Sequence, residues 1–333
     1  MNQKSTISLG ILILIITSFS LVLINDYLNQ SNQVLIDEDI TDILVYPLYF
    51  DGSESFKHLK NQVDIGFRYP GTHEINLTRS YITNHLNLFN WTVIFHNFTF
   101  KGIDVTNILA FPANATNTTL SSTRLFGAHY DTRIKADRDP IEANKSLPVL
   151  GANDGASGVA ILLEMARIYK NSTNIGLFFI DAEDQGGAIS GWNYIEGSRE
   201  FAGVLENFFP NGANSIASFI LFDMIGDKDL NIPRERNSNN QLMNEIWESA
   251  KLLGFDNFFL NQPGYAMTDD HIPFKDAGVP VVDLIDFDYL DEDNRNLHHT
   301  TRDNLDYVSE DSLKIVGQTI EFWLRTLDIW STS

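Results

Sequence analysis

Three apolar runs of strand length, at residues 175–180, 218–222 and 279–285, constrain the fold of this chain more than any other feature. A further strand is expected at residues 124–128, and helical stretches separate these segments. A strand that is apolar on both faces is typical of a parallel sheet buried between helices. Strands that alternate with helices favour the same arrangement. The sequence therefore predicts an α/β fold with a mostly parallel central sheet that is flanked by helices on both faces.

The remaining elements are predicted from periodicity and turn residues. Residues 53–88 read as helical, with a turn signal in the Pro-Gly pair of residues 69–72. Residues 92–100 alternate apolar and polar side chains as a strand does. Further elements are expected as a strand at 106–111 and as helices at 155–169 and 309–327.

The N-terminal segment contains an uncharged apolar run at residues 7–24. Its length of about 18 residues is near the lower limit for a membrane-spanning helix. Lys4 precedes the run and Asp26 follows it, so the positive-inside rule places the N-terminus in the cytoplasm. A cleaved signal peptide is the alternative, but no small-x-small cleavage site follows Ile24. An uncleaved N-terminal transmembrane helix is therefore the favoured prediction.

This prediction places the rest of the chain outside the cytoplasm, or in the secreted fraction if the segment is cleaved. Eight Asn-x-Ser/Thr sequons between Asn29 and Asn171 are compatible with an exterior location in a host that glycosylates. The expected organisation is an anchor or signal segment at 1–25, a stalk at 26–50 and a catalytic domain at 51–333.

The charge balance and the absence of cysteine narrow the possible functions. The net charge is −21, and the acidic residues are spread along the chain. Such a surface repels phosphates, so a nucleic-acid partner is not expected. Because the chain has no cysteine, thiolate nucleophiles and cysteine-bound zinc are excluded. Any metal must be held by His, Asp and Glu.

Polar side chains gather where the apolar runs are predicted to end. In open α/β sheets, active sites collect at the carboxyl ends of the strands. One Asp before a helix is commonly only an N-cap, but the chain has five such polar sites, and together they favour a shared functional site. They lie at residues 129–131, 151–155, 181–184 and 223–226, and in the pair 268–271 and 298–300.

These segments contain enough ligands for zinc, which takes three or four nitrogen or oxygen donors and keeps one position open in enzymes. Asp154, Asp184 and His299 could supply one set. His129 and Asp223 could add a second metal ion that shares Asp154 as a bridge.

The neighbouring acids Glu183 and Asp184 are the most informative pair. At a strand end the backbone turns, so both side chains can face one pocket. One carboxylate can then bind metal, while the other stays free to act as general base and then general acid. Gly186 and Gly187 follow closely and indicate a loop with special backbone requirements.

Together these motifs resemble the co-catalytic zinc aminopeptidase superfamily, and within it most closely the bacterial-type glutaminyl-peptide cyclotransferases. The resemblance runs from about Gln62 to the C-terminal helix. The segments that carry it are Gly127-Ala128-His129-Tyr130-Asp131-Thr132, Gly151-Ala152-Asn153-Asp154-Gly155-Ala156-Ser157-Gly158, Asp181-Ala182-Glu183-Asp184, Asp223-Met224-Ile225-Gly226, Asp269-Asp270-His271-Ile272-Pro273-Phe274 and His299-Thr300. The resemblance implies a single domain with a twisted, mixed sheet between helices.

The resemblance also implies roles for individual residues. Asp154, Asp184 and His299 match the zinc ligands of the cyclases, and Glu183 matches their catalytic acid/base. Asp223 and one of Asp269 or Asp270 match acids that hydrogen-bond the reacting centre, and we expect Asp270 to take the catalytic role. The residues expected to contact the substrate are Trp192, Asp269 and Phe287.

Two activities follow from the resemblance, and they differ in metal content. A cyclase would use one zinc ion to form N-terminal pyroglutamate from glutamine with release of ammonia. An aminopeptidase would use two zinc ions, with His129 and Asp223 binding the second one. The motif around Asp270 and the insertion 185–196, whose Trp192 would form an aromatic wall, favour the cyclase.

Two departures weaken the match to the cyclases. Their last metal-binding His commonly follows a Trp, whereas this chain has His298 at that position. Asp184 stands where the ligand is usually Glu, although both residue types bind zinc. The acidic segment 286–296 is expected to influence the preference for the second substrate residue.

A third possibility is a non-enzymatic ectodomain that has lost its metals. Loss of ligands would be its mark, but every expected ligand position holds a competent residue, so this alternative is disfavoured. The expected partners are peptide or protein N-termini as substrates and the membrane through the N-terminal helix. We expect the protein to be a monomer.

Overall fold

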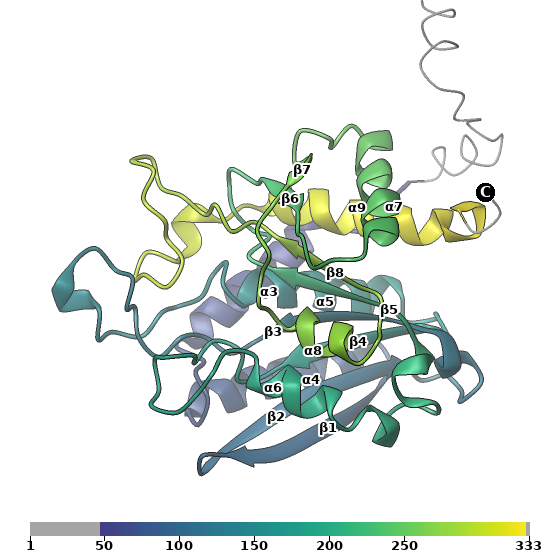
Figure 1. The fold of residues 1–333 in the computed structure, drawn as a ribbon, viewed down its shortest axis with the longest axis horizontal. Coiled ribbons are helices and arrows are strands. Elements are labelled where there is room, and N and C mark those ends of the chain that lie inside the picture. Colours follow the sequence, from purple (N-terminus) through teal and green to yellow (C-terminus); the bar gives the residue numbers. More distant parts are fainter. Residues whose placement is uncertain (1–46, 331–333) are drawn as a thin grey trace, which may run out of the picture. The chain divides into compact units, whose positions relative to one another are not determined.

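The apolar runs form the centre of a six-stranded sheet in the computed structural model, which describes residues 47–330 (Figure 1). The parallel strands lie side by side in the order β4-β3-β5-β8. Their bounds are Thr123–His129 for β3, Ile175–Ile180 for β4, Ile216–Asp223 for β5 and Val281–Ile285 for β8. These strands are buried almost throughout, which confirms the mostly parallel sheet predicted from continuous apolar runs.

A hairpin completes the sheet on one edge. β1 (Trp91–Phe100) pairs with β2 (Ile103–Pro112), and β2 pairs with β4, in both cases antiparallel. Most of β1 is exposed or half-buried, in keeping with the alternating pattern of an edge strand. The sheet is therefore mixed, as expected.

Helices cover both faces of the sheet. Phe178 of β4 stacks on Phe201 of α6 (Glu196–Ala202), with ring centroids 4.2 Å apart. On the same face Phe219 of β5 stacks at 4.1 Å on Phe274 of α8 (His271–Asp276). Both helices lie on the near side of the sheet in Figure 1. The opposite face packs against α5 (Ala156–Ile168) and α9 (Glu310–Trp330).

Two capped helices precede the sheet. The side chain of Asp51 accepts backbone N–H groups at the start of α3 (Gly52–Ile65), and Thr72 caps α4 (His73–Leu88) in the same way. The turn predicted at residues 69–72 separates them, with Gly71 at a φ of +88° that favours glycine.

A second, two-stranded sheet was not predicted from the sequence. β6 (Ile232–Arg234) pairs in parallel with β7 (Phe259–Pro263), and α7 (Asn240–Leu252) lies between them in sequence. β6 has three residues, which is too short for a periodicity to emerge. Short 3₁₀ helices lie at Thr119–Ser122, Glu142–Asn144, Leu205–Asn207, Gly212–Ser215 and Leu305–Tyr307.

The predicted membrane anchor and most of the predicted stalk lie outside the described residues. Within residues 47–330, none of the helices combines the length and the apolarity needed to cross a membrane. Leu48–Arg325 form one compact unit, which contains all the residues discussed below.

Close contact between α5 and the sheet depends on glycine at position 158. A Cβ there would overlap the carbonyl oxygen of Phe222 and would lie 2.8 Å from the Cβ of Ala128. We expect Gly158→Ala to lower the free energy of unfolding by about 1–3 kcal/mol, because overpacking outweighs the better helix propensity of alanine.

Chemical denaturation would measure this difference. Gly203→Ala is the matched control, since an added Cβ at this exposed position would meet its nearest atom at 3.4 Å. Equal stabilities of the two variants would show that the tight approach of α5 is not required.

Candidate metal centre

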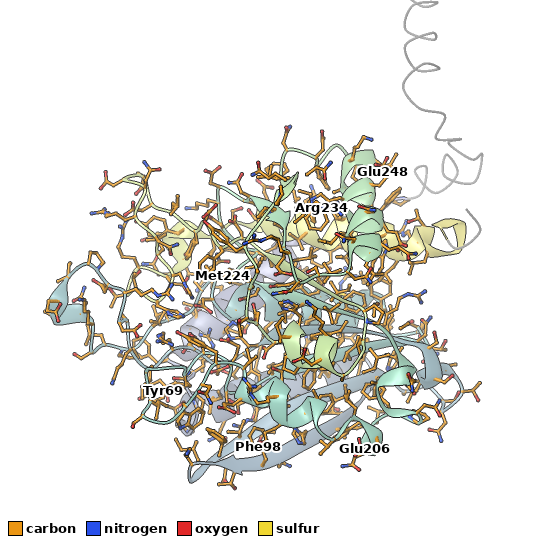
Figure 2. All side chains as sticks on the ribbon, viewed as in Figure 1. Tyr69, Phe98, Glu206, Met224, Arg234 and Glu248 are labelled. Carbon is orange, nitrogen blue, oxygen red and sulfur yellow. The ribbon has the colours of Figure 1, made fainter. Side chains whose placement is uncertain are left out.

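The polar segments predicted at strand ends converge on one cavity of about 210 Å³. His129 and Asp223 are the last residues of β3 and β5, while Glu183 and Asp184 follow β4. Met224, labelled in Figure 2, lies on the cavity wall directly after Asp223. The lining residues are Arg138, Asp154, Glu183, Asp184, Tyr194, Asp223, Met224, Met267, Thr268, Asp269, Ile285, Phe287, His298 and His299.

One group of ligand atoms surrounds the Oδ2 atom of Asp154. The Nε2 atoms of His298 and His299 lie 3.5 Å and 3.6 Å from it. The same Nε2 atom of His299 lies 2.8 Å from Oδ1 of Asp184. The expected first set, Asp154, Asp184 and His299, is therefore brought together, and His298 stands beside it.

A second group surrounds the other carboxylate oxygen of Asp154. Nε2 of His129 lies 3.2 Å from Oδ1 of Asp154 and 3.3 Å from Oδ1 of Asp223. The ligand atoms of this group lie within 4.8 Å of one another, as do those of the group formed by Asp154, His298 and His299. Asp154 thus lies between the two groups, with one oxygen turned to each, which is the placement that a bridging ligand would need.

Asp131 holds the loop that carries the paired acids. Its two carboxylate oxygens accept the backbone N–H groups of Glu183 at 3.0 Å and Asp184 at 3.3 Å, and the side-chain amide of Gln185 at 3.0 Å. Ala182 has a φ of +61°, which turns the backbone after β4. A non-glycine residue in this region costs about 1–3 kcal/mol, and the contacts of Asp131 offset that strain.

Arg133 fixes Asp184 from a second side. Its guanidinium donates to the backbone carbonyl of Asp184 at 2.9 Å and to Oδ1 of the same residue at 3.2 Å.

The ring of Tyr194 lies nearly parallel to His299, with centroids 6.3 Å apart. A Cβ on Gly186 would overlap the Tyr194 ring, so this glycine has the structural reason that the sequence suggested.

Asp303 positions Asp154 through hydrogen bonds to the backbone. Its carboxylate accepts the backbone N–H of Asn153 at 2.8 Å and that of Asp154 at 3.1 Å. Tyr289 donates its hydroxyl to the same carboxylate at 3.1 Å. This buried acid therefore fixes the backbone from which the carboxylate of Asp154 extends.

We expect Asp303→Asn to weaken zinc binding by about 10–100-fold, the range measured for residues that orient metal ligands. The carboxylate of Asp303 accepts hydrogen bonds from two backbone N–H groups. In the Asn variant the side-chain NH₂ would face one of these N–H groups, so that hydrogen bond would be lost. Competition with a chelating dye would measure the affinity. Asp306→Asn, three residues further on and exposed, is the matched control; equal affinities of the two variants would contradict the assigned role.

Glu183 lies in an environment that suits proton transfer. Burial raises the pKa of Glu183 well above its usual value, and the charges of Asp184 and Asp270 add to the effect while His129 opposes it. Burial together with Asp223 also raises the pKa of Asp269. The carboxyl of Glu183 can therefore carry a proton at a pH where an exposed glutamate cannot.

The donor set fits a divalent cation such as zinc. Oδ2 of Asp154 and Oδ2 of Asp184 are buried and have no hydrogen-bond partner. Buried carboxylate oxygens without partners are costly unless a cation or a proton satisfies them. Burial lowers the pKa of His299 to about 3, so its imidazole is neutral, as a metal ligand must be.

Of three residues expected to contact the substrate or to take part in proton transfer, two line the cavity and one does not. Phe287 and Asp269 line the cavity, as a substrate contact would. Asp270 does not line it but lies behind it, where it accepts a hydrogen bond from the hydroxyl of Ser198. Its influence on Glu183 is therefore exerted through charge.

The expected aromatic wall is not formed by Trp192. Its indole is buried in an apolar cluster with Val105 and Ala182, and it meets the ring of Phe100 edge-on at 5.0 Å. Within the same insertion, Tyr194 is the aromatic residue that lines the cavity. The reason is that the apolar side chains near the turn of the β1–β2 hairpin offer the larger indole a buried site.

Several residues of the site were missed from the sequence. Asp131 belongs to the motif that contains His129, but no role was assigned to it. Asp303 lies four residues after His299, and this short spacing was the only available signal. Arg133 and Arg138 lie in a loop without periodicity, so no pattern could indicate that Arg133 contacts Asp184 or that Arg138 lines the cavity.

A sequence model of peptidase family M28 matches residues 108–324. Among curated proteins, the aminopeptidase YwaD of Bacillus subtilis is 29% identical over 182 residues, which are 51% of this chain and 36% of that protein. The chain thus spans little more than a third of the length of this relative.

Solved structures match over more of the chain. The glutaminyl cyclase of Bacteroides thetaiotaomicron, bound to N-acetylhistamine, has a TM-score of 0.74 at 29% identity, covering 83% of this chain and 98% of that one. A Zn-dependent exopeptidase from Parabacteroides distasonis has a TM-score of 0.73 at 28% identity, covering 82% and 97% respectively. Both enzyme types thus share this architecture.

Proposed function

This chain belongs to peptidase family M28, and on that premise we propose that it is a zinc-dependent glutaminyl-peptide cyclotransferase. It would convert an N-terminal glutamine into pyroglutamate and release ammonia. The site residues would be Asp154, Asp184 and His299 for one zinc ion and Glu183 for proton transfer.

The observation that carries the proposal is the difference between the two groups of ligand atoms. In the first group, Oδ2 of Asp154 and Oδ2 of Asp184 are buried without hydrogen-bond partners, and a cation bound between them would satisfy both. In the second group, Nε2 of His129 already lies within 3.3 Å of a carboxylate oxygen of both Asp154 and Asp223. One metal ion in the first group would satisfy the unpartnered carboxylate oxygens, in keeping with the metal content expected of a cyclase.

The cavity supports an N-terminal substrate. Its volume of about 210 Å³ is below the ~300–1,000 Å³ that is usual for drug-sized ligands. Apolar walls of Met224, Met267 and Phe287 face the acidic end. A cavity of this size can hold the side chain and the free α-amine of one residue, which suits an enzyme that acts on the N-terminal residue of a peptide.

Proton transfer in this proposal rests on Glu183. Asp154, Asp184 and His299 would hold a zinc ion, which would act as a Lewis acid toward a carbonyl oxygen of the substrate. The carboxylate of Glu183 accepts a proton from the attacking α-amine and then delivers it to the departing ammonia. Asp269 and Asp223 also line the cavity, where they would orient the amine, while burial and the charges of Asp184 and Asp270 keep the pKa of Glu183 raised.

An aminopeptidase is the second candidate, and one observation favours it. The ligand atoms of His129, Asp154 and Asp223 lie close enough together to hold a metal ion as well. With two zinc ions, Glu183 would act as the base for a water molecule, and a peptide bond would be hydrolysed.

A direct comparison of two peptides tests the proposal. The zinc-loaded protein is incubated with a Gln-initiated peptide and a Leu-initiated peptide of otherwise identical sequence, and both are followed by mass spectrometry. We expect loss of ammonia from the Gln peptide alone. Removal of an entire N-terminal residue from either peptide would favour the aminopeptidase and reject the cyclase.

A further inference from the structure

Arg138 is the one lysine or arginine among the residues that line the cavity, and its guanidinium is not neutralised. Among the described residues, no carboxylate lies within ion-pair distance of Arg138, whereas Arg133 pairs with Asp137 and Asp184. Acids make up a large part of the cavity wall in a chain with a net charge of −21. The guanidinium is therefore free to meet an anion that enters the cavity.

The position of Arg138 is fixed by its neighbours in the chain. Its backbone N–H donates to the carbonyl of His299 at 3.2 Å. The next residue, Asp139, accepts the backbone N–H of Thr301 at 3.0 Å and the hydroxyl of the same residue at 2.6 Å. The loop that carries Arg138 is therefore tied on both sides to the segment that carries His299.

His298 holds the guanidinium itself. Arg138 donates from one terminal nitrogen to Nδ1 of His298 at 2.8 Å. Because arginine has no acceptor, Nδ1 must be the unprotonated nitrogen, and the neutral ring then carries its hydrogen on Nε2. Nε2 of His298 lies 3.5 Å from Oδ2 of Asp154 without a hydrogen bond between them. In this tautomer Nε2 carries a hydrogen and has no free lone pair, so His298 is not a metal ligand.

The ring of His298 is supported on its other side by Phe287, with centroids 5.0 Å apart and planes at 67°. A guanidinium has five N–H donors in a rigid fork, and the contact with His298 uses one of them. The remaining donors match the two oxygens of a carboxylate, which a planar fork binds in a bidentate manner.

We propose that Arg138, positioned by His298, forms a subsite for a substrate carboxylate next to the metal centre. This inference rests on the proposed function, because it concerns peptides whose N-terminal residue occupies the cavity. The carboxylate has two possible sources: an acidic side chain at the second residue, or the C-terminus of a dipeptide. In both cases the subsite offsets the repulsion that the acidic walls exert on an anionic substrate.

Four substrates distinguish the two sources. They are Gln-Glu-Ala amide and Gln-Gln-Ala amide, which differ at the second side chain, and the dipeptide Gln-Ala as free acid and as amide. For at least one pair, we expect the ratio of kcat/KM between the acid and its neutral partner to fall about tenfold in Arg138→Gln. The pair that responds identifies the source of the carboxylate.

Lys135→Gln is the matched control, since it removes the same charge from the same loop at an exposed position that does not line the cavity. Its ratios should equal those of the unmodified protein. Ratios that are also unchanged in Arg138→Gln for both pairs would overturn the proposal.

A binding measurement separates this inference from the proposed function. The same four peptides are titrated calorimetrically into Glu183→Gln, with and without Arg138→Gln. An affinity ratio that depends on Arg138 supports the subsite even if no peptide is turned over. Turnover of Gln peptides with no dependence on Arg138 in either measurement would reject the subsite and leave the cyclase intact.

Discussion

Replacing Glu183 with Gln should lower kcat for a Gln-initiated peptide by a factor of about 10²–10⁴. The amide keeps the shape of the side chain, but it cannot accept a proton from the amine or return it to ammonia. Glu183 is buried on the cavity wall, and its backbone N–H is held by Asp131, so the local structure should persist. Initial rates measured by ammonia release would give the change.

The same variant should keep its zinc, because the proposed ligands are Asp154, Asp184 and His299. The zinc content, measured by elemental mass spectrometry, should equal that of the unmodified protein. Glu206→Gln is the matched control, at an exposed glutamate labelled in Figure 2. If Glu183→Gln kept its activity, Glu183 could not be the acid/base. If the variant lost its zinc, Glu183 would be a metal ligand.

The second large effect is expected for Asp154→Asn. This carboxylate lies at the centre of both groups of ligand atoms, and each of its oxygens faces one of them. An amide offers a single neutral oxygen, so we expect zinc affinity to fall by more than about 100-fold, beyond the range found for residues that only orient ligands. Activity should fall with zinc occupancy.

Titration of zinc against a competing chelator would measure this loss. Asp311→Asn, at an exposed position in the first turn of α9, is the control. If Asp154→Asn kept its zinc affinity, the metal would have to lie elsewhere than at the strand ends. Removal of zinc from the unmodified protein with a chelator should abolish activity, and added zinc should restore it.

The sheet could be predicted because its signal is strong and local. Continuous apolar runs such as residues 175–180 and 218–222 are typical of strands that are buried on both faces. The polar residues after these runs lie at one edge of the sheet by the geometry of parallel strands. Asp184, which follows β4, and Asp223, at the end of β5, lie at that edge for this reason. β6 was missed because a strand of three residues is too short to show an alternation of apolar and polar side chains.

The residues that complete the site depend on contacts distant in sequence. Trp192 and Tyr194 are two positions apart and both aromatic, and the apolar pocket beside Val105 and Phe100 decides which of them is buried away from the cavity. Arg138 is placed by a hydrogen bond to His298, at a separation of 160 residues. No local pattern encodes either arrangement.

The most direct test of the central claim uses water enriched in a heavy oxygen isotope. The zinc-loaded protein is incubated in this water with a Gln-initiated peptide, and the products are weighed by mass spectrometry. The cyclase account predicts a peptide that has lost ammonia and contains no oxygen from the solvent, because the amine is the nucleophile. Release of a free N-terminal residue that carries the heavy oxygen would contradict it and would establish hydrolysis of the peptide bond.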